Sequence, residues 1–274
     1  MLEYMLRNTP RLVEKPVRFG AFHVVCLCIV LLLAVLMICF RSRLPKSERG
    51  LRICLTVFGV GLLLLEVGKQ LVYSFDPVTG WAYNWEKFPF QFCSVPIYVA
   101  LIAMWLREGR LRTALLAFLA TYSPVAGASV LFYPSSAVFS EIIFLNVHTM
   151  LWHGMMLLFG LYLWLSGRVS ADLRTAGWAA VVYAPLNFIA LALNEASYAW
   201  SFAAGYEFNM FYTGRMGTCL IPVLSTIQKT CPYPVFFISY LITLGVGGFL
   251  VALCMMLIRR LTHEGDSTHE KEKK

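Results

Sequence analysis

The sequence predicts an all-α, polytopic transmembrane helix bundle with seven spans. Three observations predict it: 59% of the 274 residues are hydrophobic, only 14% are charged, and long apolar runs recur along the whole chain. Soluble domains contain roughly 25% charged residues, and a helix that crosses the hydrocarbon core needs about 20 apolar residues. Repeated runs of that length predict several spans and not one anchor.

Short polar or basic breaks separate the spans and set their expected boundaries. The first apolar run follows a basic segment, but it is long for a signal peptide and has no small-residue cleavage site, so it is expected to remain as a helix. In chain order, the seven spans are expected near 20–40, 51–74, 88–106, 110–133, 140–166, 173–195 and 234–260. Residues 1–261 then form one membrane domain, and 262–274 form a charged cytoplasmic tail.

The distribution of Lys and Arg predicts which side of the membrane each loop faces. Loops one, three and five, with the adjoining helix ends, contain ten of these residues, and loops two, four and six contain three. Cytoplasmic loops carry the excess of basic residues. The odd loops and the C-terminus are therefore expected in the cytoplasm of a cell-membrane protein, with the N-terminus outside. Four basic groups in the first 19 residues oppose this orientation, unless that segment lies along the membrane interface.

The net charge of +8 does not indicate a nucleic-acid partner. The basic residues stand between apolar runs and at the two ends of the chain, and they form no patch on a foldable soluble unit. Membrane topology accounts for this charge, and membrane lipids are the expected partners. Neither charge nor periodicity encodes an oligomeric state.

Ionisable residues inside the second span indicate a site. Glu66 and Lys69 are three positions apart on one helical face, and Tyr73 continues that face. Charged side chains within a span cost at least ~2.5 kcal/mol on insertion scales, so they usually face the bundle interior. An internal ion pair is therefore expected, with either a structural role or a role in a binding site.

The fifth span combines two histidines with a polar face. Asn146, Thr149 and His153 share that face, and His148 points about 140° away from His153 at 3.6 residues per turn. Two zinc ligands on one helix need i, i+4 spacing, and further ligands must lie nearby. The spacing argues against a metal site, and neither a metal nor another cofactor is expected.

Polar residues of five spans lie toward the even-loop ends of their helices. His23 lies there in the first span, Cys93 beside Gln91 in the third and Asn187 in the sixth, together with Glu66 and Lys69 of the second span and His148 of the fifth. His153 is expected deeper, roughly 20 Å from that surface. Scattered structural hydrogen bonds would not concentrate in one half of the bilayer. A cavity that opens toward the outer leaflet and suits a lipid or small amphiphile is therefore expected.

Several short motifs occur in order along the chain: Phe22-His23, Glu66 through Lys69, Phe88-Pro89-Phe90 leading to Cys93, His153-Gly154, Phe208-Asn209-Met210 and Pro232-Tyr233-Pro234. Together with their spacing across seven apolar segments, these motifs resemble the bacterial YwaF-type membrane proteins and their animal relatives, the transmembrane protein 164 family. The resemblance covers most of the chain.

Animal members of that family are regarded as acyltransferases that move a fatty acyl chain between phospholipids with a cysteine and a histidine. The resemblance implies that these roles fall on Cys93 and His153, with His148 as the alternative histidine and with phospholipid or lysophospholipid as substrate. Many bacterial relatives have a His and an Asp where this chain has Gln91 and Ser94, so a third polar partner of the dyad stays open. The expected substrate-binding residues are Glu66, Lys69, Tyr73, Gln91, Asn146, Thr149, Asn187 and His23.

Two other functions stay open on the residues alone. An intramembrane Glu66–Lys69 pair also fits an ion or proton pathway, and so a small-solute transporter or membrane binding protein. Polar stripes also hold helices together in a purely structural membrane protein. Cys219 and Cys231, twelve positions apart in the last outer loop, leave a disulfide open in an oxidising exterior.

Overall fold

Helices form most of the described chain, which is residues 1–134 and 138–272 of a computed structural model, with side chains up to Arg260 except at position 202. The helices are α1 Leu2–Arg7, α2 Ala21–Cys39, α3 Glu48–Tyr73, α4 Val95–Trp105, α5 Arg110–Phe132, α6 Ile143–Leu165, α7 Leu173–Ala203, α8 Pro222–Thr230 and α9 Tyr233–Glu272. Short 3-10 turns lie at Arg41–Arg43, Trp85–Lys87 and Met210–Tyr212, and β1 Phe75–Asp76 pairs antiparallel with β2 Gly80–Trp81.

Six of the described helices are long and apolar enough to cross a membrane, namely α2, α3, α5, α6, α7 and α9. The predicted span near 88–106 contains only the 11-residue α4, which is about 16 Å long at 1.5 Å per residue. Residues 88–94 include Pro89 and stay irregular, because the residue before a proline disfavours the helical conformation. Pro96, in contrast, lies in the first turn of α4, where proline is favoured. Seven spans are thus not confirmed by helix length.

The other expected boundaries agree with the helices to within a few residues, except at the ends of the sixth and seventh spans. Helix α9 continues twelve residues beyond the predicted boundary at 260, to Glu272, and so includes most of the predicted charged tail. The sixth span also ends later than predicted. There α7 continues eight residues beyond the predicted boundary at 195, to Ala203. The short helix α8 and the β1–β2 hairpin were not predicted, because long apolar runs identify membrane spans and do not reveal elements of two to nine residues.

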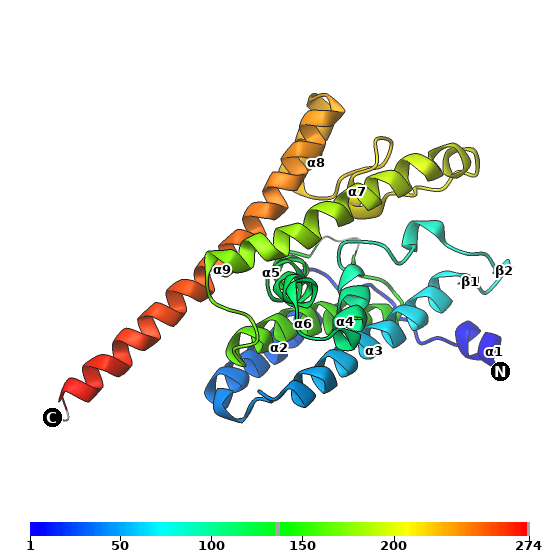
Figure 1. Cartoon of the computed structure of the whole chain (residues 1–274). Coiled ribbons are helices and arrows are strands. Elements are labelled where there is room, and N and C mark those ends of the chain that lie inside the picture. The colour runs from blue at the N-terminus through cyan, green and yellow to red at the C-terminus, as the bar shows by residue number, and fades with distance from the viewer. Residues whose placement is uncertain (135–137, 273–274) are drawn as a thin grey trace.

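The centre of the bundle is the pair α5 and α6, with α2 and α3 on one side and α7 and α9 on the other (Figure 1). Two glycines let these central helices approach closely. A Cβ at Gly160 would lie 2.1 Å from Cγ of Pro124, and a Cβ at Gly127 would lie 2.6 Å from the carbonyl oxygen of His153. Small residues at such contacts are typical of membrane helix pairs.

Gly127→Ala is expected to destabilise the protein by about 2 kcal/mol, since the added methyl group meets rigid backbone and forces α5 and α6 apart. The matched control is Gly177→Ala on α7, where an added Cβ meets nothing within 4 Å. That change should leave stability equal or slightly raised, because alanine favours helix. Unfolding in detergent, followed by tryptophan fluorescence, measures both. Equal stability of the two variants would contradict the close α5–α6 contact.

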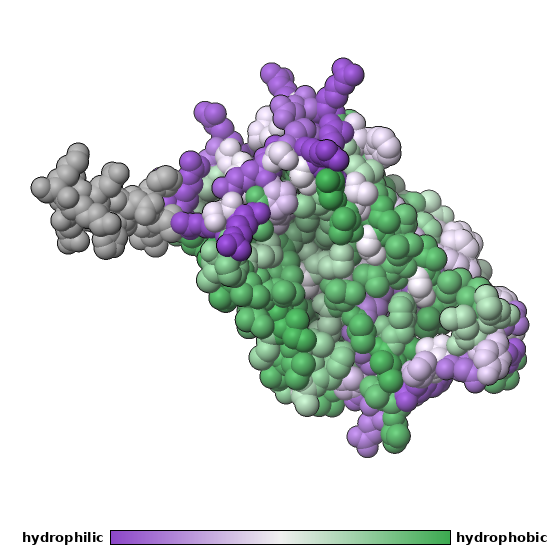
Figure 2. Space-filling model, turned by 90° about the horizontal axis from the view of Figure 1, so that it is seen from below, coloured by the Kyte–Doolittle hydropathy of each residue, from purple (hydrophilic) through white to green (hydrophobic). Residues whose placement is uncertain are grey.

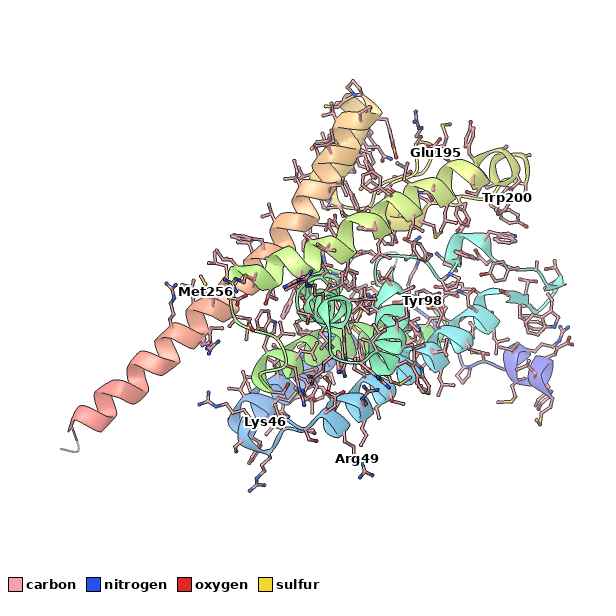
Figure 3. All side chains as sticks on the ribbon, in the orientation of Figure 1. Lys46, Arg49, Tyr98, Glu195, Trp200 and Met256 are labelled. Carbon is pink, nitrogen blue, oxygen red and sulfur yellow. The ribbon has the colours of Figure 1, made fainter. Side chains whose placement is uncertain are left out.

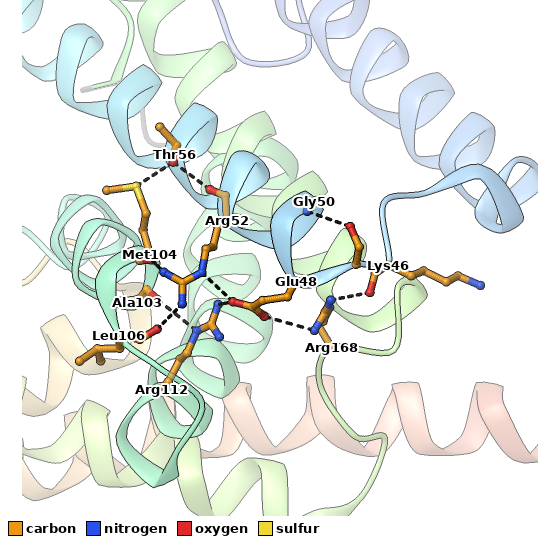
Figure 4. A network of polar contacts seen from close by, with 11 residues as sticks. Lys46, Glu48, Gly50, Arg52, Thr56, Ala103, Met104, Leu106, Arg112 and Arg168 are labelled. Carbon is orange, nitrogen blue, oxygen red and sulfur yellow. Dashed lines mark hydrogen bonds and ion pairs between the residues drawn. The ribbon is translucent and has the colours of Figure 1, made fainter.

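One end of the bundle is held together by a carboxylate and three guanidinium groups (Figure 4). Glu48 at the start of α3 lies 2.8 Å from both Arg52 and Arg112, and 3.6 Å from Arg168, which follows α6. Arg52 also donates a 3.0 Å hydrogen bond to the carbonyl of Leu106, just after α4. The start of α3, the end of α4 and the start of α5 therefore lie at the same end, and residues 74–105 carry the chain back to it.

The N-terminal segment lies at the opposite end of the bundle. Arg7 donates to the carbonyl of Pro77 in the β1–β2 hairpin, and the N–H of Leu12 donates to the carbonyl of Glu141 at 2.7 Å. Figure 3 shows the same separation at the surface, with Lys46 and Arg49 at one end and Glu195 and Trp200 at the other. The basic N-terminal residues are thus fixed by contacts with the even loops and are not part of the Glu48 end.

The surface between the two ends is largely apolar. Figure 2 shows hydrophilic side chains gathered at one end and in a smaller group at the other, with a broad hydrophobic region between them. The most apolar windows of α2 and α9 are only 11% buried, with mean hydropathies of 3.1 and 2.5. Such helices are stable only where lipid covers them. The chain is therefore a multi-pass membrane protein.

Candidate functional site

A cavity of about 290 Å³ lies at the end of the bundle opposite Glu48, between α3, α6, the 88–94 segment and the loop after α7. Seven of the eleven predicted site residues line it: Lys69, Tyr73, Gln91, Cys93, His148, Thr149 and His153. These residues come from distant parts of the sequence. Their convergence agrees with the expectation that polar groups gather at the even-loop ends of the helices.

Cys93 is held in the cavity wall by its own backbone. The indole N–H of Trp152 donates a 3.0 Å hydrogen bond to the carbonyl oxygen of Cys93, and the N–H of Ser94 donates to the carbonyl of Gln91 at 2.7 Å. Helix α4 begins two residues later, at Val95. The cysteine therefore lies at the N-terminus of a short helix, where the macrodipole favours negative charge.

His153 is fixed in one orientation and one tautomer. Its Nδ1 lies 2.7 Å from the carbonyl oxygen of Thr149. A carbonyl oxygen only accepts hydrogen bonds, so Nδ1 carries the proton and Nε2 carries the lone pair. Among the residues that the structure describes, this buried Nε2 has no hydrogen-bond partner. An unpartnered basic nitrogen is thus present in the same cavity as a thiol.

His148 lines the same cavity, although it lies on a different face of α6. Thr149 and Trp152 line the cavity between the two histidines, so the cavity wraps around this part of the helix. The ring of His148 stacks on Trp152 with centroids 5.0 Å apart, and its buried Nε2 has no partner in the described part of the chain. Both histidines therefore line the cavity, and they differ in how each ring is held.

The expected ion pair between Glu66 and Lys69 is present. Nζ of Lys69 lies 2.7 Å from Oε1 and 2.8 Å from Oε2 of Glu66, and 5.8 Å from the ring centroid of Trp152. Lys69 lines the cavity with Cys93, whereas Glu66 lines a second cavity of about 540 Å³ between α3, α4 and the β1–β2 hairpin. The ion pair thus holds the ammonium group of Lys69 in the cavity that contains Cys93, near the ring of Trp152.

A strained turn in the loop between α7 and α8 closes one side of the cavity. Phe211 and Tyr212 have φ angles of 57° and 58°, in the left-handed region that disfavours residues with a Cβ. The side chain of Gln91 holds the turn, because its Nε2 donates to the carbonyl of Asn209 at 2.9 Å and its Oε1 accepts from the N–H of Phe211 at 3.0 Å. Such strain persists only where surrounding contacts fix it, and it is common at functional sites.

Family membership agrees with this arrangement. The family model described as the TMEM164 family matches residues 18–259, which is most of the chain and includes every residue that lines the cavity. The chain belongs to the TMEM164 family. No curated protein and no solved structure matches it. The resemblance inferred from the ordered motifs is therefore confirmed at the level of the family.

Four predicted residues of this TMEM164-family chain lie outside the cavity. His23 accepts from the N–H of Phe19 at 3.0 Å and contacts the carbonyl of Leu131 at 2.8 Å, so it fixes the start of α2 to the end of α5. Asn146 makes two hydrogen bonds to the backbone of Ser140.

Asn187 and Glu66 are the other two. Asn187 is fully buried and donates to the carbonyl of Tyr183 within α7. Glu66 lines the neighbouring cavity. The structure thus gives His23 and Asn146 clear roles in holding helices and loops together, and their predicted substrate role stays a prediction.

Several cavity residues were missed by the sequence interpretation. Trp152 follows His148 by one helical turn, a spacing that was visible, but its bond to Cys93 joins residues 59 positions apart. Tyr212 lies in the loop after α7, two positions beyond the Phe208-Asn209-Met210 motif, and burial raises its pKa to about 12. Its phenol is therefore a neutral hydroxyl, able to donate a hydrogen bond in the cavity.

Within the described residues, no group of three or more His, Cys, Asp or Glu side chains is placed to hold a metal ion. Cys219 and Cys231 are both free thiols, so the disulfide left open by the sequence is not formed in this structure.

Proposed function

We propose that this TMEM164-family protein is a membrane acyltransferase that moves a fatty acyl chain between phospholipids through a thioester at Cys93, with His153 as the base. The observation that supports it best is that a thiol and an oriented, unpartnered imidazole nitrogen line one cavity of about 290 Å³. A thiol and a base that line one cavity, with the base oriented by a third group, are the components of covalent catalysis, which also requires the two to come within hydrogen-bond reach of each other.

The chemistry requires one nitrogen to act twice. Nε2 of His153 takes the thiol proton of Cys93, and the thiolate adds to the ester carbonyl of a phospholipid. The acyl–oxygen bond breaks, and the departing lysophospholipid oxygen takes the proton from Nε2. A thioester remains on Cys93. The hydroxyl of a second lysophospholipid then gives its proton to Nε2 and attacks the thioester, and the sulfur leaves as a thiol with that proton.

Five groups favour the development of charge at Cys93, at the ester carbonyl and at His153. Burial among apolar groups disfavours a thiolate, and the positive N-terminus of α4 and the ammonium of Lys69 oppose that penalty. The hydroxyl of Tyr212 and the buried hydroxyl of Ser94, which has no partner among the described residues, can donate to the carbonyl oxygen as it becomes negative. The carbonyl of Thr149 orients the imidazole of His153, which is the role of the carboxylate in many catalytic triads.

The same proposal includes seven crossings of the cell membrane, with the C-terminus in the cytoplasm and the N-terminus outside. The irregular 88–94 segment and α4 together form the short third crossing, because the chain leaves the Glu48 end along α3 and is back there at Leu106. The basic residues around Glu48 favour the cytoplasmic side. The cavity with Cys93 then lies in the outer half of the bilayer.

The direct test is detection of the intermediate. Purified protein in nanodiscs is incubated briefly with a phospholipid that carries a labelled acyl chain, quenched in acid and digested. The proposal expects the acyl mass on the peptide that contains Cys93 and its release by hydroxylamine, which cleaves thioesters. Label on no cysteine, together with active acyl transfer, would exclude the covalent mechanism.

Trp152→Phe is expected to lower the rate of acyl transfer about tenfold, because the indole N–H that fixes the Cys93 carbonyl is lost. The matched control is Trp164→Phe. Trp164 lies on the same helix as Trp152 but away from the cavity, and its replacement removes a 2.7 Å hydrogen bond from the indole N–H to the carbonyl of Ala120. Both changes should cost about 1 kcal/mol of stability. Equal rates for the two variants would remove the positioning role of Trp152.

A further inference from the structure

A larger cavity of about 580 Å³ adjoins the one that contains Cys93 on the side of the outer loops. It lies between the end of α7 and the loop that leads to α8, and Glu207 and Thr218 line both cavities. Figure 3 places Glu195, another lining residue, near the outer end of α7. A molecule that reacts in the inner cavity therefore has space for its polar end directly next to it.

The wall shared by the two cavities is well defined. Oε1 of Glu207 accepts a 2.8 Å hydrogen bond from the N–H of Thr218, and Asn209 donates to Glu207 at 3.4 Å and to the carbonyl of Thr218 at 3.2 Å. Gly217 allows this packing, since a Cβ there would lie 2.2 Å from Nδ2 of Asn209. The carboxylate of Glu207 is thus held in place by hydrogen bonds at the boundary between the cavities.

The charges of the outer cavity favour a cation. It contains two carboxylates and one guanidinium, and Glu195 pairs with Arg215 at 2.8 Å. Glu207 is in no ion pair among the residues that the structure describes, so one negative charge is left over. Aromatic side chains at Tyr198, Tyr206 and Phe208 line the same space. A carboxylate beside aromatic rings is the chemistry that binds ammonium groups.

We infer that this outer cavity binds the ammonium group of a zwitterionic head group, on the lipid whose acyl ester reacts at Cys93. The inference rests on the proposed function for the reaction, and it adds the residue that selects the substrate, Glu207. Anionic head groups without an amine meet the unpaired carboxylate and are disfavoured. The head group stays near the water at the outer loops while the ester reaches the inner cavity.

The test measures binding without turnover. Short-chain ether lipids, which contain no ester to react, carry either a phosphocholine or a phosphoglycerol head group, and their affinities for the full chain in nanodiscs are measured by saturation-transfer NMR. We expect the wild-type protein to bind the phosphocholine lipid about tenfold more tightly. Glu207→Gln should reduce that ratio to about one, while its amide oxygen still accepts from Thr218.

Two further variants keep the test decisive. Glu207→Asp retains the charge and should retain most of the preference for the phosphocholine lipid. Glu141→Gln removes a carboxylate at the same end of the molecule but outside the cavity, so this preference should be unchanged. A wild-type protein without preference, or an undiminished preference in Glu207→Gln, would overturn the inference. Absence of the Cys93 thioester would instead overturn the proposed reaction and leave the binding result as it is.

Discussion

Replacing Cys93 with serine is expected to lower the rate of acyl transfer by at least about 10³-fold. Serine is close to cysteine in size, so the bond between Trp152 and the backbone of residue 93 and the shape of the cavity should survive. The hydroxyl, however, is a much weaker acid than a thiol and a much poorer nucleophile, so the same imidazole activates it far less well. The measurement is transfer of a labelled acyl chain from phospholipid to lysophospholipid by protein in proteoliposomes.

The control for this change is Cys254→Ser. Cys254 is an exposed thiol on α9, which presents its apolar side chains to lipid, and it lines none of the three cavities. Its replacement should leave the rate within about twofold, as expected for a surface change away from the site. A Cys93→Ser protein that is folded and transfers acyl chains at the wild-type rate would show that the thiol has no role in the reaction.

The helices could be predicted from the sequence because membrane spans need long apolar runs, and that requirement is local. The predicted start of the first span at 20 and the predicted end of the fourth at 133 lie within one residue of α2 and α5. The third span is not confirmed as one long helix, because hydropathy does not distinguish a helix from an irregular apolar segment. Pro89 and Pro96 were visible, but only the folded chain shows that α4 starts at Val95.

The site was predicted only as far as helical periodicity reaches. Position along the helices placed Lys69, Cys93 and His148 near one surface of the bilayer and His153 deeper. The structure brings all four to one cavity. Helical position could not place Asn146 correctly within that half of the bilayer, because its hydrogen bonds to Ser140 depend on the path of a loop. Contacts between distant loops, such as that of Gln91 with the turn at 209–211, carry no local signal.

His153→Gln is expected to lower acyl transfer by about 10² to 10⁴-fold, the range of a lost general base. Glutamine retains hydrogen-bonding groups that can reach the carbonyl of Thr149, but it has no basic nitrogen in place of Nε2. The same variant should slow the alkylation of Cys93 by iodoacetamide, because the thiol loses the base that takes its proton. This second measurement needs no lipid and therefore separates activation of the thiol from substrate binding.

His148→Gln decides between the two histidines. Its ring is held by stacking on Trp152, and among the described residues no hydrogen bond fixes its tautomer, whereas His153 is oriented by Thr149. Since an imidazole of undefined tautomer is a base for only part of the time, His148→Gln should lower the rate less than about tenfold, mainly through the loss of packing beside Trp152. If His148→Gln loses the larger factor, both in transfer and in alkylation of Cys93, the base is His148, and the bond between His153 and Thr149 only stabilises α6.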